Sequence, residues 1–297
     1  MSGSHGAVLG PMTDHERYHF DVYGYIVRRA VLSPNEVQAL NVAVDLLSLP
    51  EATDATMRTV AKVLITMGPP CYRSHQQLWS VVVPKVVQLT LRYGHIPQIG
   101  YSHTAFAGLL AWVSGDFETG KLFSELANKL MESALASPSD KSVYHLMVGS
   151  SVRHWFTHMA HSSQEYESAF AIGSEAGNLQ YAAYAFGHNM YCRFFQGAPL
   201  DALVRETNSS LAFSRTRRNQ WAIDLLEGGL RIFASLTDPV LVASEDPGTE
   251  QAYLQSVGMH QNLQVACIYR VLKTCELLLL SDYQRARAWS DEAEATI

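Results

Sequence analysis

The chain has little charge and no cluster of basic residues. Only 17% of its 297 residues are Asp, Glu, Lys or Arg, against roughly 25% in an average soluble domain. Lys and Arg number 22 and Asp and Glu number 28, which gives a net charge of -6. A chain without a basic patch cannot follow a phosphate backbone, so we expect no nucleic-acid partner. The low charge indicates instead that part of the surface is covered by a protein partner.

Cysteines are few, and long hydrophobic runs are missing. The four cysteines, Cys71, Cys192, Cys267 and Cys275, show no two-residue spacing. This excludes a zinc knuckle and a redox dithiol and predicts reduced core residues of a cytoplasmic protein. The first ten residues lack the pattern of a signal peptide. The longest uncharged hydrophobic stretch, 101–115, is shorter than the ~20 residues that a bilayer requires, so we expect no membrane span.

Strand patterns are almost absent, and most of the chain has the periodicity of helices. Tyr25–Val27 is the one segment that predicts a strand. Ser33 to Glu36 has the pattern of a capped helix start with Pro34 at the first helical position, and this helix runs to about Ser48. Gly, Pro and Ser divide the rest into helical intervals, at 49–50, 68–70, 94–100, 114–120, 137–140, 177–178, 197–199 and 244–248.

Tight turns recur between pairs of amphipathic segments. They lie at 114–117, 195–198 and 280–283, with a fainter one at 162–165. Spacings of about 35 to 48 residues between successive turns fit the repeat lengths of helical hairpins. We therefore predict an all-α fold, a superhelical stack of antiparallel helix pairs (a tetratricopeptide-like solenoid) over residues 52–297. A disordered N-terminus at 1–12 and a small α/β appendage at 13–50 precede it.

Several segments follow one another in an order typical of one family. They are LITMGPPCY at 64–72, PKVVQLTLRYG at 84–94, the hairpin at 100–131, RHW at 153–155, GSEAGN at 173–178, YAAY at 181–184 and GAPL at 197–200. From about residue 57 to 297 the chain resembles the helical-repeat region of large bacterial sensor histidine kinases and signal-transduction ATPases. The resemblance implies a non-catalytic scaffold or connector for protein-protein interaction in signal transduction. It implies kinase or ATPase modules as partners and no cofactor.

A second resemblance is confined to the N-terminus. Residues 20–27, FDVYGYIV, and 31–34, VLSP, followed by Glu36 and Val37, are similar to the first segment of the phytanoyl-CoA dioxygenase family, over about 15–45. That family implies Fe(II) and 2-oxoglutarate chemistry on a barrel of many strands. Because the chain lacks such strands, we expect no enzyme; a degenerate or truncated dioxygenase is the alternative.

Two short motifs have a structural and a chemical interpretation. Residues 115–121 fit the start of a phosphate-binding loop, but Leu122 stands where a Ser or Thr is needed, so we predict a repeat turn. His154, His158 and His161 lie at i, i+4 and i+7 of one predicted helix. The third would lie about 10 Å along the axis from the first, too far for a compact metal site. We predict packed histidines, no metal and no catalytic residue.

Aromatic and histidine residues are concentrated between 140 and 200. This segment holds eleven aromatic residues and five histidines but seven charged residues. Tyr and Trp are favoured anchors of interfaces, and repeat proteins bind partners on their concave face. We therefore predict a concave partner-binding face formed by Trp155, His158, Tyr184, His188 and Tyr191. A small-molecule sensor, with these side chains around a pocket, is the further alternative.

Overall fold

The computed structural model describes residues 49–96, 99–133, 136–238 and 247–295. In these ranges the chain is all-α, as predicted, and its one β feature is an isolated parallel bridge between Glu51 and His95. Four predictions lie outside the described residues: the disordered N-terminus at 1–12, residues 13–48 of the appendage predicted at 13–50, the strand Tyr25–Val27 and the helix start at Ser33.

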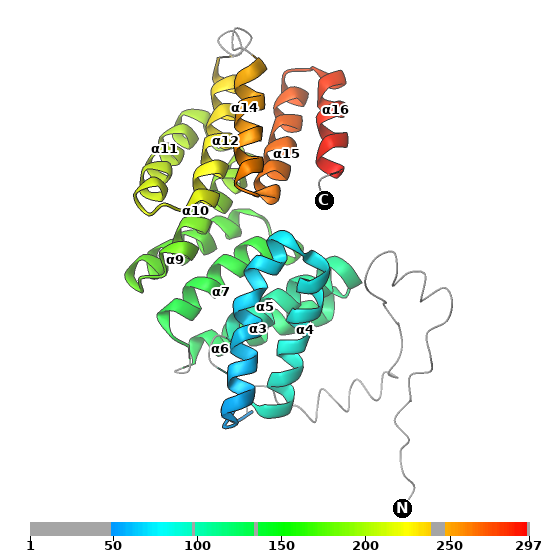
Figure 1. Ribbon diagram of the computed structural model, residues 1–297, viewed down its shortest axis with the longest axis vertical. Coiled ribbons are helices and arrows are strands. Elements are labelled where there is room, and N and C mark those ends of the chain that lie inside the picture. Colours follow the sequence, from blue (N-terminus) through cyan, green and yellow to red (C-terminus); the bar gives the residue numbers. More distant parts are fainter. Residues whose placement is uncertain (1–48, 97–98, 134–135, 239–246, 296–297) are drawn as a thin grey trace, which may run out of the picture.

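The helices follow one another through short connections (Figure 1). In chain order they are α3 (Ala55–Ser74), α4 (Gln76–Tyr93), α5 (Ile99–Leu109), the π-helical turn η1 (Leu110–Ser114), α6 (Phe117–Glu132), α7 (Pro138–Ser151), α8 (Arg153–Phe156), α9 (Ala160–Glu175), α10 (Leu179–Phe195), α11 (Leu200–Thr216), α12 (Gln220–Thr237), α14 (Pro247–Met259), α15 (Leu263–Leu279) and α16 (Tyr283–Glu294).

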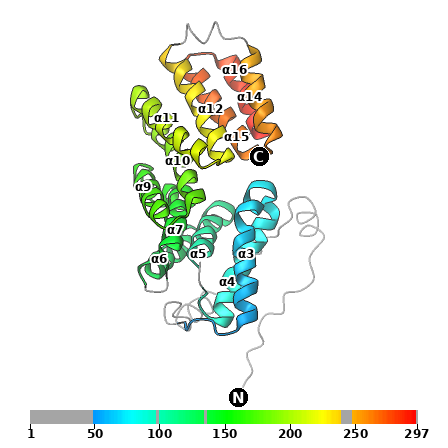
Figure 2. The ribbon, with the colours of Figure 1, turned by 60° about the vertical axis from the view of Figure 1, so that its left-hand side comes forward.

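Most helices pack against their neighbours in the chain. α3 contacts α4, α5 contacts α6, α7 contacts α9, α9 contacts α10, α11 contacts α12, and α15 contacts α16. α10 and α15 also contact α12, which joins the successive pairs. The arrangement curves, so that α15 comes back to α3 near the start of the described chain (Figures 1 and 2). The early and late helices therefore face a common interior.

Three of the predicted turns are confirmed, and the residues in them explain why. Gly115 and Gly197 adopt left-handed backbone conformations, with φ of 63° and 76°, which glycine reaches without steric cost. Asp116 then begins α6, since its carboxylate accepts a hydrogen bond of 3.0 Å from the amide of Thr119. Asp282 begins α16 in the same way. Local chemistry therefore ends one helix and starts the next.

Two other predicted breaks are wrong, because packing continues the helix through them. The turn at 162–165 lies inside α9, where Ser162 and Ser163 are buried and Gln196 donates a hydrogen bond of 2.8 Å to Ser163 Oγ. The break at 68–70 lies inside α3, which includes both prolines. Gly68 contacts the Tyr101 ring so closely that a Cβ would lie 2.4 Å from its Oη. Tertiary contacts override the local preference in both places.

The largest core cluster lies between α7 and α15. Its fully buried members include Leu203, Leu225, Leu226, Phe233 and Leu272. Two smaller clusters join α3 and α4 to α5, α6 and α7. In the described part of the chain, no helix is both long enough and apolar enough to cross a membrane.

Candidate functional site

A cavity of about 1150 Å³ lies on the inner side of the curve. Its lining comes from α3, α4, α5, η1, α7, α10, α12 and α15. Nine aromatic residues surround it, and we call it the aromatic cavity: Tyr72, Trp79, Tyr101, Trp112, Tyr181, Tyr184, Tyr191, Phe195 and Trp221. The exposed side chains Trp112, Phe195 and Leu263 show that it opens to solvent.

Helix α10 provides one wall of the aromatic cavity. Tyr181, Tyr184, His188, Tyr191 and Phe195 all line the cavity and recur at helical spacing. The Tyr184 ring meets Trp221 of α12 edge to face, with centroids 4.8 Å apart and planes at 74°. Its hydroxyl accepts a hydrogen bond of 2.7 Å from Gln180. Such edge-to-face pairs fix the orientation of the wall.

His188 and Tyr191 form a hydrogen-bonded pair in this wall. His188 Nδ1 meets the Tyr191 hydroxyl, and the imidazole lies over the rings of Tyr166 and Trp221 at 5.8 and 5.4 Å. Burial lowers the pKa of His188 to about 4 and raises the pKa of Tyr191 far above its usual value. Both side chains are therefore uncharged at neutral pH.

A second part of the lining comes from the first described helices. Trp79 Nε1 of α4 donates a hydrogen bond of 3.1 Å to Tyr101 Oη of α5. The Tyr72 ring of α3 meets Trp79 at 5.2 Å. The π-helical turn η1 places Trp112 and Val113 in the lining, and its end at Gly115 is left-handed. Single π-helical turns are frequent at functional sites because they re-aim side chains.

The third wall is aliphatic and belongs to α15. Leu263, Ile268, Val271 and Leu272 line the cavity beside Gln264 and Cys267. Gln264 is joined to α12, because its Oε1 accepts a hydrogen bond of 3.3 Å from Trp221 Nε1. The lining thus connects the first helix pair, the central α10 and α12, and the last helix pair.

Three of the five predicted partner-binding residues lie together, and two lie elsewhere. Tyr184, His188 and Tyr191 line the aromatic cavity, whereas Trp155 and His158 do not. Trp155, in the short helix α8, packs against Phe117 with ring centroids 5.8 Å apart. His158 precedes α9, and its Nδ1 accepts a hydrogen bond of 3.2 Å from the amide of Ala160.

The predicted single helix with His154, His158 and His161 is interrupted. α8 ends at Phe156 and α9 begins at Ala160, so His158 lies between two helices. Val152, before α8, also departs from helical geometry, with φ of -126°. Among the described residues, no group of three or more His, Cys, Asp or Glu side chains is arranged to hold a metal ion.

Sequence analysis missed most of the other aromatic residues of the lining. Tyr72, Trp79, Tyr101, Trp112 and Trp221 come from five different elements. The sequence contains no spacing that relates them, because long-range packing alone brings them together. The one feature of the sequence that could have indicated these residues is their amino-acid type, since Trp and Tyr are favoured in binding sites.

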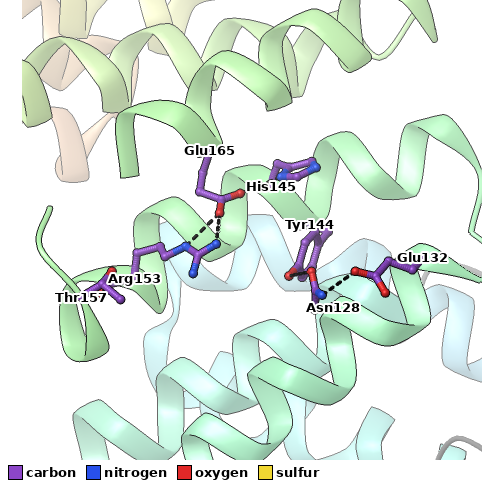
Figure 3. A network of polar contacts seen from close by, with 7 residues as sticks. All are labelled: Asn128, Glu132, Tyr144, His145, Arg153, Thr157 and Glu165. Carbon is purple, nitrogen blue, oxygen red and sulfur yellow. Dashed lines mark hydrogen bonds and ion pairs between the residues drawn. The ribbon is translucent and has the colours of Figure 1, made fainter. Parts of the chain in front are cut away.

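A polar network lies outside the cavity and holds α8 in place (Figure 3). Arg153 donates through Nε to Glu165 Oε1 at 2.8 Å, and a second guanidinium nitrogen contacts the same oxygen. His145 Nδ1 lies 2.6 Å from Glu165 Oε2. Beside them, Tyr144 donates to Asn128 at 3.0 Å, and Asn128 donates to Glu132 at 2.8 Å. Because these polar groups satisfy one another's hydrogen bonds, we interpret the network as a structural support of α8.

Comparison with protein-family models finds no match, and comparison with curated proteins also finds none. A function for this chain is therefore inferred from its own residues, above all those of the aromatic cavity.

Proposed function

We propose that this chain is a non-catalytic helical-repeat module of a bacterial signalling protein, which senses a ligand in the aromatic cavity and connects kinase or ATPase modules. The observation that carries the proposal is the origin of the lining, which includes α3 and α4 at one end and α15 at the other. A ligand in the cavity touches both ends, so its affinity depends on their arrangement, and its binding shifts that arrangement.

The helical pairing and the resemblance support the tetratricopeptide-like part of this proposal. Consecutive antiparallel helices, closed by turns at 114–117, 195–198 and 280–283, are the unit of such stacks. In helical-repeat proteins the concave side carries the binding surface. The connector role, its partners and a cytoplasmic location come from the resemblance and the composition.

The electrostatics of the lining support binding rather than catalysis. A general acid or base works best when its pKa is near the working pH. The pKa of His188 is about 4, and the pKa of Tyr191 is far above neutrality. Neither group is poised to exchange a proton at pH 7, so the pair orients the wall without changing charge.

A melting experiment with metabolite fractions tests the sensor function. A ligand that binds only the folded chain stabilises it by about 2.7 kcal/mol at 100 times its Kd. We expect one fraction from the native cells to raise the melting temperature of the wild-type chain. Trp112→Gln removes an exposed ring from the lining, and Trp155→Gln removes an exposed ring outside it. The shift should be lost in the first variant and kept in the second; equal shifts in both would contradict the proposal.

A second candidate function is a site for a segment of a partner protein, favoured by the exposed anchors at the rim. Trp112 and Leu263 are 53% and 58% exposed and lie in the lining, and Trp is one of the side chains enriched at interface hot spots. A photo-crosslinking amino acid in place of Trp112 should then attach to one protein in the cell. The same amino acid in place of Trp155 should not. Attachment at both positions, or at neither, argues against this candidate.

A further inference from the structure

The described lining of the aromatic cavity is polar in places but contains no acidic residue, lysine or arginine. Burial lowers the pKa of His188 to about 4 and raises the pKa of Tyr101 and of the Cys267 thiol, so these groups are neutral at pH 7. The described lining therefore offers no carboxylate, ammonium or guanidinium group as a counter-charge to a ligand.

Three pairs of polar side chains in the lining are engaged with each other. Trp79 donates to Tyr101 at 3.1 Å, Trp221 donates to Gln264 at 3.3 Å, and His188 pairs with Tyr191. An anionic ligand would lose its hydration without gaining a cationic partner, which is costly in such a site, and a cationic ligand would exchange its hydration for contacts with ring faces alone. An uncharged ligand avoids that cost.

The residue types of the walls favour an aromatic ring. Aromatic side chains of α4 and α5 form one wall, and those of α10 and α12 form another, while α15 adds aliphatic side chains such as Val271 and Leu272. Aromatic rings gain energy from edge-to-face and offset contacts with a further ring. The volume of about 1150 Å³ is slightly above the ~300–1000 Å³ of most small-molecule sites.

From these observations we propose that the aromatic cavity binds a small, uncharged aromatic molecule. This inference rests on the proposed sensor function and names its ligand class. The lining residues that support it are the aromatic residues Trp79, Tyr184 and Trp221 and the uncharged pair His188 and Tyr191.

Three fluorescent probes with one ring system test the ligand class. They are neutral N-phenyl-1-naphthylamine, its anionic sulfonate, and a cationic derivative with a trimethylammonium group. Trp79, Trp112 and Trp221 line the cavity, so a bound probe should quench their fluorescence. We expect the neutral probe to bind with one site per chain and each charged probe at least about tenfold more weakly. A charged probe that binds as tightly as the neutral one, or no binding of the neutral probe, overturns the inference.

Variants of α15 locate the probe. Val271 lines the cavity and is 39% exposed, and Leu278 lies on the same helix outside the lining and is 48% exposed. Val271→Asp should raise the affinity for the cationic probe relative to the neutral one by about tenfold, and Leu278→Asp should leave the ratio unchanged. An unchanged ratio in Val271→Asp places the probe elsewhere and overturns the inference. Circular dichroism should show that both variants are folded.

The probes and the metabolite fractions separate the two proposals. If a fraction stabilises the wild-type chain but not Trp112→Gln, while the neutral probe does not bind, the ligand class is wrong and the sensor function stands. If the neutral probe binds in the cavity and no fraction stabilises the chain, the ligand class stands for this cavity and the sensor function fails.

Discussion

At the scale of single residues, Glu165 depends on two neighbours that come from other helices. Burial acts to raise the pKa of its carboxyl, but hydrogen bonds from His145 and Arg153 outweigh it and hold the pKa below the usual value. Because the folded pKa is depressed, the stabilisation is present above the unfolded pKa of about 4.3 and is lost as the pH falls through the folded pKa. We expect Glu165→Gln to cost about 1–2 kcal/mol at pH 7, since Arg153 is partly exposed.

Urea unfolding at pH 7 and at pH 3 checks this prediction for Glu165. The difference between wild type and Glu165→Gln should shrink at pH 3, because the unfolded chain then binds a proton at Glu165 and the stabilisation falls as the pH approaches the lowered pKa of the folded state. Asp201→Asn is the matched control, because Asp201 pairs with Arg205 on the open surface, where both side chains are 71% exposed. The control should show no measurable loss at pH 7. A difference for Glu165→Gln that stays constant with pH would show that the carboxylate charge is unimportant.

His188 makes the stability of the folded chain depend on pH, because burial lowers the pKa of His188 in the folded state to about 4. The unfolded value is about 6.5, so protonation favours the unfolded chain. The contribution of neutral His188 is complete above the unfolded pKa and is lost as the pH falls from there toward the folded pKa. We expect the wild-type chain to lose roughly 1–2 kcal/mol more stability between pH 7 and pH 5 than His188→Asn does. Equal losses in urea unfolding would show that His188 is hydrated and titrates normally.

Residue types in the sequence indicated part of the site but not its limits. The stripe of Tyr184, His188 and Tyr191 repeats within one helix, so helical geometry places the three side chains on one face. Trp155 is aromatic as well, but it lies in α8, which a break separates from α9, and it does not line the cavity. Arg153 of α8 contacts Glu165 of α9 across this break, and the sequence alone does not show that the two residues pair.

At the scale of elements, glycines set how closely the late helices pack. A Cβ on Gly228 of α12 would lie 2.3 Å from Tyr253 Oη of α14 and 3.0 Å from the Tyr269 ring of α15. Tyr253 cannot move without losing the hydrogen bond of 2.7 Å that it donates to the Asp224 carbonyl. We expect Gly228→Ala to cost about 1–3 kcal/mol through overpacking, measured by thermal or urea unfolding.

Gly258→Ala is the matched control for this prediction. Gly258 lies in α14 with nothing within 4 Å of the Cβ position. Because Ala has the higher helix propensity, the change should be neutral or stabilising by up to about 1 kcal/mol. Similar losses in both variants would mean that the α12 to α14 contact is loose in solution.

Helices and most of their turns were predictable, since these depend on nearby residues. Asp116 and Asp282 cap their own helices, and Gly197 ends one through its own backbone. The failures at 68–70 and 162–165 involve partners far along the chain, Tyr101 and Gln196. A local pattern cannot show that a distant ring or amide keeps a helix intact.

At the scale of the whole molecule, the aromatic cavity exists because the chain curves back from α15 to α3. The sequence predicted stacked helix pairs, which need local periodicity, but curvature is the sum of small rotations between successive pairs. Such rotations depend on how closely neighbouring helices pack, as at Gly187 of α10, where a Cβ would lie 2.7 Å from the Leu225 side chain of α12. The cavity could therefore not be predicted from a sequence motif or from the spacing of residues.

Hydrogen exchange with and without the neutral naphthylamine probe tests whether the cavity couples the early helices to the late ones. A ligand that contacts α3, α4, α10 and α15 should slow exchange in all four, because opening any of them breaks its contacts. α6 and α11 contribute no lining residue and act as internal controls. We expect strong slowing in α3 and α15 and little change in α6 and α11. Slowing confined to α10 would show that the probe binds one wall, and the early and late helices would then respond independently.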